Sequence, residues 1–515
     1  MTEARPLSSP DVLIIGSGMG GATLAAGLAG SGARVLILER GEQLLDELRA
    51  RDPRAIFMEG CYRPKETWFD GDDAPFNPGN YYYLGGNSKF YGAVMLRYRE
   101  KDFAPLEHTE GVTPGWPISY AELEPWYGAA ERLFEVRGAL GQDPTEPPHS
   151  TPYPHAPVPD EEPIARVRER LKAAGLHPFS LPLAVDIERW LAGGRTPWDA
   201  HPDTRSGKLD AETAALARAL ADPNIAVMTG MRALRLIAAA DGRRIEAVEV
   251  EHHGHRSVLR AGLVVLSAGA VNSAALLLAS SSSQNPAGLA NRSGAVGRYF
   301  MNHNSSAMLA IDPRLRNSSI YQKTLGLNDF YFTDGAGGAP LGNVQLLGKI
   351  TAPILKANMR RAPMPALRAL AAYSFGWYLM SEDLPHPESR VRLDGGRIVL
   401  DWRRSNMSAH ARLAKVMRER FRAAGFPIVL SRPFDRRTPS HQCGTVRFGC
   451  DPASSALDVF CRAHDHPNLY VVDASFLPTS AAVNPALTIA AMALRVADHI
   501  RREHLRVTSN AEAKA

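Results

Sequence analysis

The sequence contains few cysteines, no long apolar segment and little excess charge. Only 4 of its 515 residues are cysteine, which is too few for a framework of disulfide bonds. No segment approaches the ~20 consecutive apolar residues that a membrane-spanning helix needs. The first ten residues, MTEARPLSSP, have neither the apolar core nor the paired arginines of an export signal. We therefore expect a cytoplasmic protein with reduced thiols and no transmembrane segment.

Two further classes of protein are disfavoured. The formal net charge is +5, and the basic residues are scattered without a nucleic-acid-binding motif, so we expect no nucleic-acid partner. Cys443, Cys450 and Cys461 lie close together, but none of their spacings is the CxxC pair of a zinc site, so we predict no metal. With 45% hydrophobic and 22% charged residues, the composition is that of a globular protein too long for one simple core.

The chain opens with a pattern typical of nucleotide binding. From residue 11 it reads DVLIIGSGMGGATLAAGLAGSGARVLILERG, which predicts a buried strand, a glycine turn, a helix and a second strand that ends at Glu39. Gly16 permits the tight turn, Gly18 lets the backbone approach a diphosphate at the helix N-terminus, and Gly21 lets helix and strand pack closely. A carboxylate at Glu39 is placed to bind ribose hydroxyls. These features predict a dinucleotide but do not separate FAD from NAD.

Sequence of the same type returns twice. LVVLSAG at 263–269 predicts another buried strand before a helix, and NLYVVDAS is followed by the helical segment PALTIAAMALRVADHI. Between these regions lie alternating strands and one long basic helix at 408–424. We therefore predict an α/β fold in which three segments form one Rossmann-like nucleotide-binding domain. An inserted substrate domain is built on an antiparallel sheet with helices.

The predicted domain bounds follow these changes of pattern. The nucleotide-binding domain is assembled from residues 8–105, 206–305 and 436–505. The substrate-binding domain takes residues 106–205 and 306–435. We expect its proline-rich stretch 138–162 to form a long surface excursion or a lid. Residues 1–7 and 506–515 are polar, and we expect them to be disordered.

The last block of the sequence separates the two cofactors. It reads HQCGTVRFGC from residue 441 and SAAVNPALTIAA from residue 480. This block resembles the C-terminal motif of the glucose–methanol–choline (GMC) oxidoreductases, H-x-x-G-T followed by an N-P or H-P pair. The glycine turn, Gly85-Gly86, the strand around Ala233, LSAGA at 266–270 and VGRYFMNH at 296–303 match that family in order. The resemblance implies the family's fold, its FAD cofactor and an alcohol-oxidising activity.

The resemblance also implies the catalytic residues. His441 matches the family's active-site histidine, and Asn484 matches its partner. Alcohol oxidation needs a base for the hydroxyl proton while hydride goes to flavin N5, and imidazole has a suitable pKa. Asn484 is suited to hold the substrate oxygen by hydrogen bonding. Asn484 followed by Pro485 is also the pattern of a helix N-terminus, so a capping role stays open.

The remaining matched positions are implied to contact the cofactor. Those at the ADP and diphosphate are Gly16, Gly18, Gly21, Glu39, Gly85, Gly86, Ser88 and Ala233. Those near the ribityl chain and the flavin are Asp473, Ala474, Asn484 and Pro485. Other histidines have plainer expectations: His303 braces the fold, and His464 and His466 lie in a solvated turn.

Two departures from the family pattern concern the flavin. Many relatives carry Asn where this chain has Tyr91, and pyranose-oxidase-like members carry a flavin-bonded histidine at the position of Phe90. No residue of 85–92 can form such a bond, so we predict that FAD is held non-covalently. WPISYAELEPWY at 116–127 is similar to the sugar-oxidising branch of pyranose oxidases and bacterial sugar dehydrogenases. This favours a sugar, glycoside or related polyol as the small-molecule substrate.

We therefore expect an FAD-dependent oxidoreductase that acts on a CH–OH group. Two alternatives stay open: a lyase of the same fold with structural FAD, and the catalytic subunit of a membrane-linked electron-transfer dehydrogenase. The stretch 360–380 is basic and then apolar and could touch a membrane, but packing in the substrate domain explains it better. The electron acceptor is either oxygen or another molecule. The sequence does not specify which alcohol and which carbon are oxidised, or the oligomeric state.

Overall fold

The computed structural model describes residues 9–194, 196–205, 207–435, 438 and 441–505. The two terminal segments that we expected to be disordered, 1–7 and 506–515, lie outside these residues. Within the described part of the chain, no helix is both long enough and apolar enough to cross a bilayer.

One region of the molecule is built on a five-stranded parallel sheet. Its order is β20–β12–β1–β2–β8, with bounds Leu469–Val471, Leu263–Leu266, Val12–Ile15, Val35–Leu38 and Ile225–Met228. β1, β2 and β12 are continuous apolar runs that are buried throughout, as a parallel sheet covered on both faces requires. The strands come from widely separated parts of the chain, which confirms the predicted α/β fold with a Rossmann-like region.

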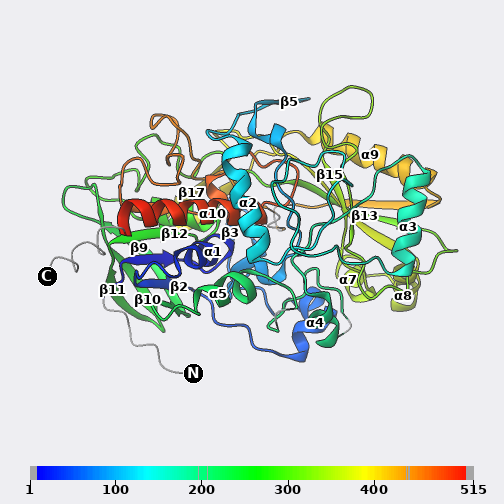
Figure 1. The fold of residues 1–515 in the computed structure, drawn as a ribbon, viewed down its shortest axis with the longest axis horizontal. Helices are drawn as coiled ribbons and strands as arrows, with labels where there is room; N and C mark the ends of the chain where they lie inside the picture. Colours follow the sequence, from blue (N-terminus) through cyan, green and yellow to red (C-terminus); the bar gives the residue numbers. More distant parts are fainter. Residues whose placement is uncertain (1–8, 195, 206, 436–437, 439–440, 506–515) are drawn as a thin grey trace.

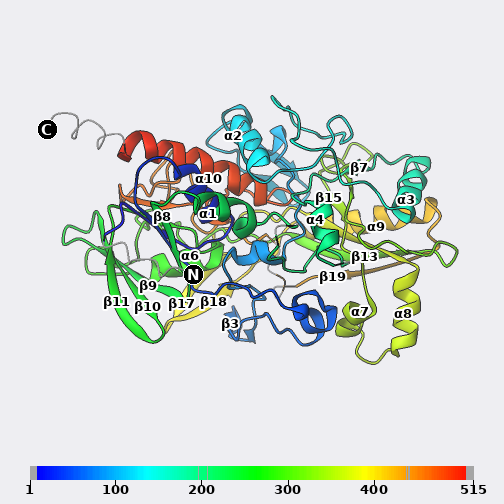
Figure 2. The ribbon, with the colours of Figure 1, turned by 60° about the horizontal axis from the view of Figure 1, so that its bottom comes forward.

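Helices and a small antiparallel sheet cover this region. α1 (Met19–Leu28) packs against α10 (Ala486–Ile500), which also contacts α2 (Tyr120–Leu133). Figure 1 and Figure 2 both show α1, α10 and α2 side by side, with α10 in red. The small sheet consists of β9 (Met231–Ala238), β10 (Ile245–His252) and β11 (His255–Arg260), and β9 contacts α6 (Ala270–Ala279).

The other region is built on a six-stranded antiparallel sheet. Its order is β19–β13–β16–β15–β14–β7, with bounds Ile428–Pro433, Asn304–Ile311, Ser374–Ser381, Asn343–Leu346, Leu325–Leu327 and Phe179–Ser180. The helices α3 (Glu162–Ala173) and α9 (Met407–Ala423) share an apolar core with this sheet. This arrangement confirms the predicted antiparallel sheet with helices.

The two faces of this sheet have different neighbours. Met308 and Trp377 point into the core shared with α9. The next residue on each strand faces the other way. Tyr378 pairs with Ala307 on one neighbouring strand and with Gln345 on the other, and all three line a cavity. Because side chains alternate along a strand, the pairing register itself places these three residues on the cavity face.

A four-stranded sheet joins chain segments that we assigned to different domains. β3 (Trp68–Asp70) pairs in parallel with β18 (Arg397–Asp401), and β4 (Pro75–Phe76) and β17 (Arg390–Asp394) complete it. Because this sheet combines strands from both predicted domains, it does not mark a boundary between them, and the predicted domain bounds remain a prediction. The remaining α-helices of the described residues are α4 (Ile187–Ala192), α5 (Ala217–Ala219), α7 (Ala352–Asn358) and α8 (Met364–Ala372), and the remaining strands are β5 (Leu106–His108) and β6 (Gly111–Thr113).

Several local expectations can be compared directly with the structure. Ser119 and Glu122 form a capping box at the start of α2. The basic helix expected at 408–424 is α9, displaced by one residue at each end. The apolar segment after Tyr373 is the central, fully buried strand β16, so its hydrophobicity serves the sheet and offers no surface to a membrane.

Candidate active site

A cavity of about 860 Å³ lies between the two regions. Its walls include the residues that follow β1, β2, β12 and β20, together with the open face of the six-stranded sheet. The carboxyl ends of parallel strands are where α/β folds bind ligands. Of the predicted site residues, eleven line this cavity: Gly16, Gly18, Glu39, Gly86, Ser88, Ala233, His441, Asp473, Ala474, Asn484 and Pro485.

The first glycine turn has the geometry that the sequence predicts. Gly16 has φ +104°, and a Cβ there would lie 2.3 Å from the Ser267 carbonyl oxygen. A Cβ at Gly21 would lie 2.0 Å from the Gly16 oxygen, so Gly21 does not line the cavity but closes the helix onto the turn. A Cβ at Gly18 would meet nothing within 4 Å, which leaves this backbone open to a ligand. Gly20, which the sequence pattern does not single out, is equally constrained, since a Cβ there would lie 1.8 Å from the Val472 oxygen.

The Glu39 carboxylate ties the end of β2 to both glycine loops. One oxygen accepts hydrogen bonds from the amide and hydroxyl of Ser17, at 3.1 and 2.6 Å, and the other accepts from the Gly41 amide at 2.9 Å. Ser17 Oγ in turn accepts from the Gly85 amide at 3.0 Å. Burial raises the pKa of Glu39, while the bonds from Ser17 and Gly41 act in the opposite direction. Glu39 therefore shapes the loops in addition to facing the cavity.

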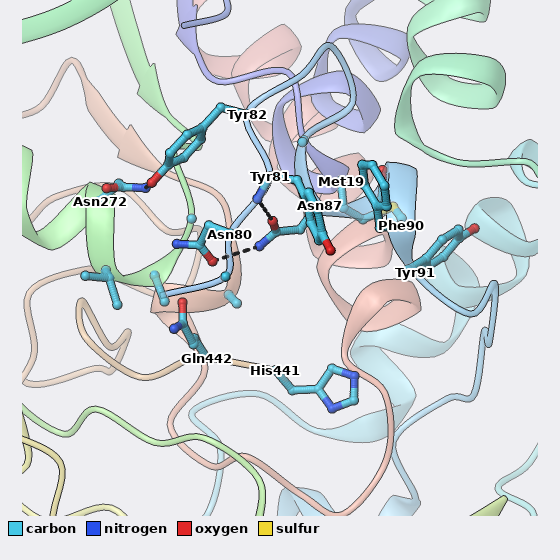
Figure 3. A pocket seen from close by; sticks show the side chains of 18 of the residues that line it. Met19, Asn80, Tyr81, Tyr82, Asn87, Phe90, Tyr91, Asn272, His441 and Gln442 are labelled. Atoms are coloured by element: carbon cyan, nitrogen blue, oxygen red, sulfur yellow. Dashed lines mark hydrogen bonds between the residues drawn. The ribbon is translucent and has the colours of Figure 1, made fainter. Parts of the chain in front are cut away.

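The second glycine loop packs on the first. Gly85 and Gly86 have φ +90° and +59°, and a Cβ at Gly86 would lie 3.4 Å from Gly18 Cα. Gly85 lies behind the cavity wall. The Ser88 hydroxyl donates to the Gly85 carbonyl at 2.6 Å and accepts from the Ala211 amide at 3.1 Å. Phe90 stacks on Tyr81, with ring centroids 3.7 Å apart, and both rings lie along the cavity in Figure 3.

Asp473 uses its carboxylate within the protein. One oxygen accepts from the Gly269 amide at 2.9 Å and from Ser273 Oγ at 2.5 Å, and the other accepts from the amide and hydroxyl of Ser475. Asp473 thus joins the end of β20 to the start of α6. The carbonyl of the neighbouring Ala474 accepts from the Gly444 amide at 3.2 Å, which links this loop to the segment of His441.

This end of the cavity fits the dinucleotide cofactor that the sequence implies. Gly18 is the N-cap of α1 and no side chain caps that helix, so its first amides have no side-chain acceptor. The Glu39 carboxylate and the Ala233 strand also line this end. A volume near 860 Å³ is within the range of sites that enclose large ligands.

The opposite end contains four polar side chains joined in a row by hydrogen bonds. His303 Nε2 lies 3.0 Å from the Ser480 carbonyl oxygen, and His303 Nδ1 lies 2.8 Å from His441 Nδ1. His441 Nε2 lies 3.3 Å from Asn484 Nδ2, and Asn484 Oδ1 accepts from Gln345 Nε2 at 3.1 Å. Figure 3 shows His441 across the cavity from the loop with Asn87 and Phe90.

The direction of every bond in this row follows from one backbone carbonyl. The Ser480 oxygen can only accept, so His303 Nε2 carries the hydrogen. Burial lowers the pKa of His303, and the neutral ring must then accept at Nδ1 from His441 Nδ1–H. His441 Nε2 is left as an unprotonated acceptor. Asn484 consequently presents its NH₂ group to His441 and its oxygen to Gln345.

His441 is held as a neutral imidazole. Its pKa lies well below the usual value, first because the ring is buried and then because His303 and Lys323 lie nearby. Its backbone has φ +72°, a conformation that few residues other than glycine adopt. Strain of this kind is typical of functional positions.

Asn484 does not cap the helix that follows it. α10 begins at Ala486 with Pro485 in the N-cap position, and no side chain caps it. The Asn484 side chain contacts His441 and Gln345 instead, so the structure favours the site interpretation over the capping one. Gln345 was missed because it is an ordinary residue of a buried strand and belongs to no motif.

Two of the other histidine expectations need comment. His466 is fully buried and its Nδ1 contacts the Arg243 carbonyl at 3.0 Å, so the expectation of a solvated residue is wrong. The turn before β20 folds inward against β10, which the sequence pattern does not reveal. His303 does brace the fold, but it does so at the predicted catalytic histidine, as described above.

The four cysteines are free thiols, with Cys443 and Cys461 buried and Cys61 and Cys450 exposed. In the part of the chain that the structure describes, no three His, Cys, Asp or Glu residues are grouped as metal ligands.

Comparisons with known proteins agree with this architecture. Family models described as GMC oxidoreductase match residues 198–305 and 385–493, and a Rossmann-like NAD(P)-binding model matches residues 14–45. The chain is 31% identical to the 6'''-hydroxyparomomycin C oxidase of Streptomyces lividus, over 95% of this chain and 92% of that protein. It is also 31% identical to the paromamine 6'-oxidase of Streptomyces fradiae, over 95% of this chain and 90% of that one.

More distant relatives extend the same picture. The chain is 29% identical to the 2-methyl-1,2-propanediol dehydrogenase of Mycolicibacterium austroafricanum, over 96% of this chain and 95% of that protein. The fold matches the crystal structure of pyridoxine 4-oxidase from Mesorbium loti with a TM-score of 0.61 at 19% identity, covering 96% of this chain and 100% of that one. With relatives above 30% identity along nearly its whole length, the chain belongs to the GMC oxidoreductases, a flavin-dependent family.

Proposed function

We propose that the protein oxidises an alcohol group of a sugar, glycoside or related polyol, with FAD as its cofactor. The observation that carries this proposal is the row of hydrogen bonds from the Ser480 carbonyl through His303 to His441, which assigns Nε2 of His441 as an acceptor in the same cavity as the glycine turns. FAD, when bound, would supply the acceptor for the hydride. The relatives named above as oxidases and a diol dehydrogenase support an alcohol substrate.

His441 would take the proton of the reacting hydroxyl on Nε2. The ring is neutral and accessible from the cavity, which a general base requires. His303 holds the Nδ1 hydrogen and would stabilise the ring once Nε2 is protonated. The Asn484 NH₂ group, oriented by Gln345, would donate to the substrate oxygen and hold the alcohol in position.

The cofactor would be held by the nucleotide end of the cavity. Backbone amides at the start of α1 would receive the diphosphate, and Glu39 would face the ribose of the adenosine. Among the described residues that line the cavity, His441 is the only histidine or cysteine, and it already has the proposed role of the base. Phe90 occupies the position of a flavin-bonded histidine in pyranose-oxidase-like proteins. These features support non-covalent FAD.

Anaerobic flavin reduction tests the proposed activity. The purified yellow protein is mixed without oxygen with a panel of sugars, glycosides and simple alcohols, and flavin absorbance is followed. We expect bleaching by at least one polyol. A protein that stays oxidised with every alcohol but cleaves a cyanohydrin would be the lyase alternative. Reduction by an alcohol followed by slow reoxidation in oxygen and fast reoxidation by a quinone would favour an electron-transfer dehydrogenase.

Acid precipitation tests how the flavin is held. The protein is denatured with acid and centrifuged, and the colour of the washed pellet is compared with that of the supernatant. We expect all of the flavin in the supernatant. A yellow pellet would contradict non-covalent binding and would point to an attachment residue outside the loop of Phe90.

A further inference from the structure

An ion pair that belongs to no family motif lies in the wall of the same cavity. Lys323 Nζ donates to Asp199 Oδ2 at 2.8 Å, and both side chains line the cavity. The lysine and aspartate side chains are 5% and 15% exposed. Asp199 precedes the left-handed residue Ala200 in the loop after α4, and Lys323 lies just before β14. The pair therefore brings together two remote segments at the cavity surface.

The polar atoms of this pair are only partly used within the protein. The Gly348 amide also donates to Asp199 Oδ2, at 2.8 Å, so both fixed bonds fall on one carboxylate oxygen. No described residue donates a hydrogen bond to Asp199 Oδ1, and the Lys323 ammonium makes one of its three possible bonds. One acceptor and two donors thus remain for a ligand in the cavity.

The pair borders the second glycine loop and lies within electrostatic range of His441. A Cβ at Gly92, which follows Phe90 and Tyr91 in that loop, would lie 2.4 Å from Lys323 Nζ and 2.8 Å from Asp199 Oδ1. The charge of Lys323 also contributes to the low pKa of His441. Gly92 therefore leaves room for the ion pair beside the loop expected to contact the flavin, within electrostatic reach of the predicted base.

A structural role alone explains the pair poorly. Two charges taken out of water gain little net stability, and well-packed apolar side chains would serve the fold at least as well. A lysine and a carboxylate with spare hydrogen-bonding groups suit two adjacent hydroxyls, since each hydroxyl can donate and accept. We propose that Asp199 and Lys323 bind hydroxyl groups adjacent to the one that is oxidised, so that the protein selects neutral vicinal polyols. This inference rests on the proposed function and narrows its substrate class.

The charges around the cavity also disfavour an amino sugar. The other carboxylates of the described lining residues are Glu39, Glu66 and Asp473, and each is already hydrogen-bonded, to Ser17, Tyr82 and Ser273 respectively. Asp199 is paired with Lys323, and a second lysine, Lys349, lines the cavity. A substrate ammonium would meet two lysines, and the only open carboxylate oxygen of the described lining residues, Asp199 Oδ1, belongs to a group whose charge is already paired with Lys323. This contrasts with the relative named as a paromamine oxidase.

The first test compares substrates that differ by one hydroxyl. Holoenzyme is mixed anaerobically with 1,2-propanediol or 1-propanol, and with glucose or 2-deoxyglucose, and the second-order rate constant of flavin reduction is measured. In Lys323→Met and Asp199→Asn, the preference for the probe with the extra hydroxyl should fall at least ~10-fold. Lys172→Met, at an exposed lysine of α3, is the matched control and should leave the preference unchanged. FAD content and Tm are measured for each variant.

The second test compares a charged with a neutral substrate, because a pair that does not contact the substrate would not change the preference between them. Lys323→Met leaves the Asp199 carboxylate unpaired, so the rate with glucosamine relative to glucose should rise several-fold. Asp199→Asn removes the carboxylate and leaves the ammonium, so the same ratio should fall. Lys323→Arg keeps the charge and serves as a folded variant if the methionine protein is unstable.

The outcomes separate this inference from the proposed function. If no alcohol reduces the flavin of the unmodified protein, both fail. If alcohols reduce it but the variants lose diol and mono-alcohol activity equally, the proposed function stands and the hydroxyl-binding role is overturned. A loss confined to reoxidation by oxygen would also overturn it, because the pair would then serve the electron acceptor.

Discussion

The two ends of the cavity are built in different ways. At the nucleotide end the shape comes from the backbone, since Gly16, Gly21 and Gly86 allow contacts that a Cβ would prevent or crowd. At the opposite end, which we propose to be the catalytic end, the shape comes from side chains, since His441 and Gln345 belong to remote segments and are joined only through their hydrogen bonds to Asn484. A side-chain change at the first end should therefore alter cofactor binding. A change at the second should alter the chemical step and leave binding intact.

The largest effect is expected at His441. His441→Ala should slow anaerobic flavin reduction by at least ~10²-fold, because the base that takes the hydroxyl proton is lost. FAD content and Tm should stay near those of the unmodified protein, because the nucleotide end does not depend on this side chain. Stopped-flow absorbance checks the rate. Reduction at a near-normal rate would remove His441 from the mechanism.

Asn484→Ala is the companion measurement. It should also slow reduction, since the substrate oxygen loses a donor that Gln345 holds in place. Because Asn484 does not cap α10, its loss should not loosen that helix, and Tm should change little. A large drop in Tm with an unchanged rate would mean that the residue serves the fold alone.

The nucleotide end could be predicted from the sequence because its geometry depends on residues that are close together in the chain. A glycine turn between a strand and a helix is specified within a few residues, and Gly16 and Gly21 have the predicted geometry. The same local reasoning missed Gly20, whose contact at Val472 is made by a strand from the far end of the chain. The parallel sheet and the antiparallel sheet were also predictable in kind, since buried apolar runs and alternating runs differ in pattern.

The catalytic end could be read only through the family motif. His441 and Asn484 were found by resemblance, whereas Gln345 carries no motif. Nothing near Gln345 in the sequence shows that it faces a cavity, because its partner on the neighbouring strand, Tyr378, is set by sheet register. Asp199 and Lys323 escaped notice for the same reason. A single strand pattern does not specify which remote residues a side chain will meet.

The next largest effect is expected on FAD binding, at Glu39. Glu39→Ala should weaken FAD binding about 10-fold to 100-fold, because hydrogen bonds to a charged group contribute roughly 1.5–3 kcal/mol. The reduction rate of the FAD-saturated protein should change far less. Fluorescence titration of the apoprotein with FAD checks the affinity, with the exposed Glu47→Ala as a control. Ser17→Ala removes the loop contact alone and should be milder; equal losses would mean that Glu39 acts only by shaping the loop.

A smaller effect is expected when the direction of the hydrogen-bond chain is disturbed. His303→Phe removes the acceptor of the His441 Nδ1 hydrogen, so the other tautomer becomes accessible and flavin reduction should slow about 10-fold. His303→Gln restores an acceptor and should recover part of the rate. Reduction rates between pH 5 and pH 9 check this, and the phenylalanine variant should also show an altered pH profile. Equal rates in both variants would argue that His303 only fills space.

Lowering the pH should change the stability of the fold in opposite directions through the buried groups of the two ends. Burial raises the pKa of Glu39 and Asp473 at the nucleotide end, so the folded state binds protons more readily than the unfolded state and acid favours it. Burial lowers the pKa of His303 and His441 at the catalytic end. The unfolded state then binds more protons, and stability falls as pH drops below the ordinary histidine value of about 6.5.

The smallest expected effect is at His410, where the loss of stability caused by protonating a buried histidine can be measured most cleanly. It lies behind the six-stranded sheet, between Ser306 Oγ at 2.7 Å and Ser381 Oγ at 3.0 Å, and burial lowers its pKa to about 4. Its stabilising contribution should be complete above pH 6.5 and should decline as pH falls from there toward 4. His410→Asn should therefore lower Tm by several degrees at pH 7.5, and by clearly less at pH 5. Thermal melts of both proteins across this range check the sign. A Tm difference that stays constant with pH would mean that His410 stabilises the fold by packing and not by remaining neutral.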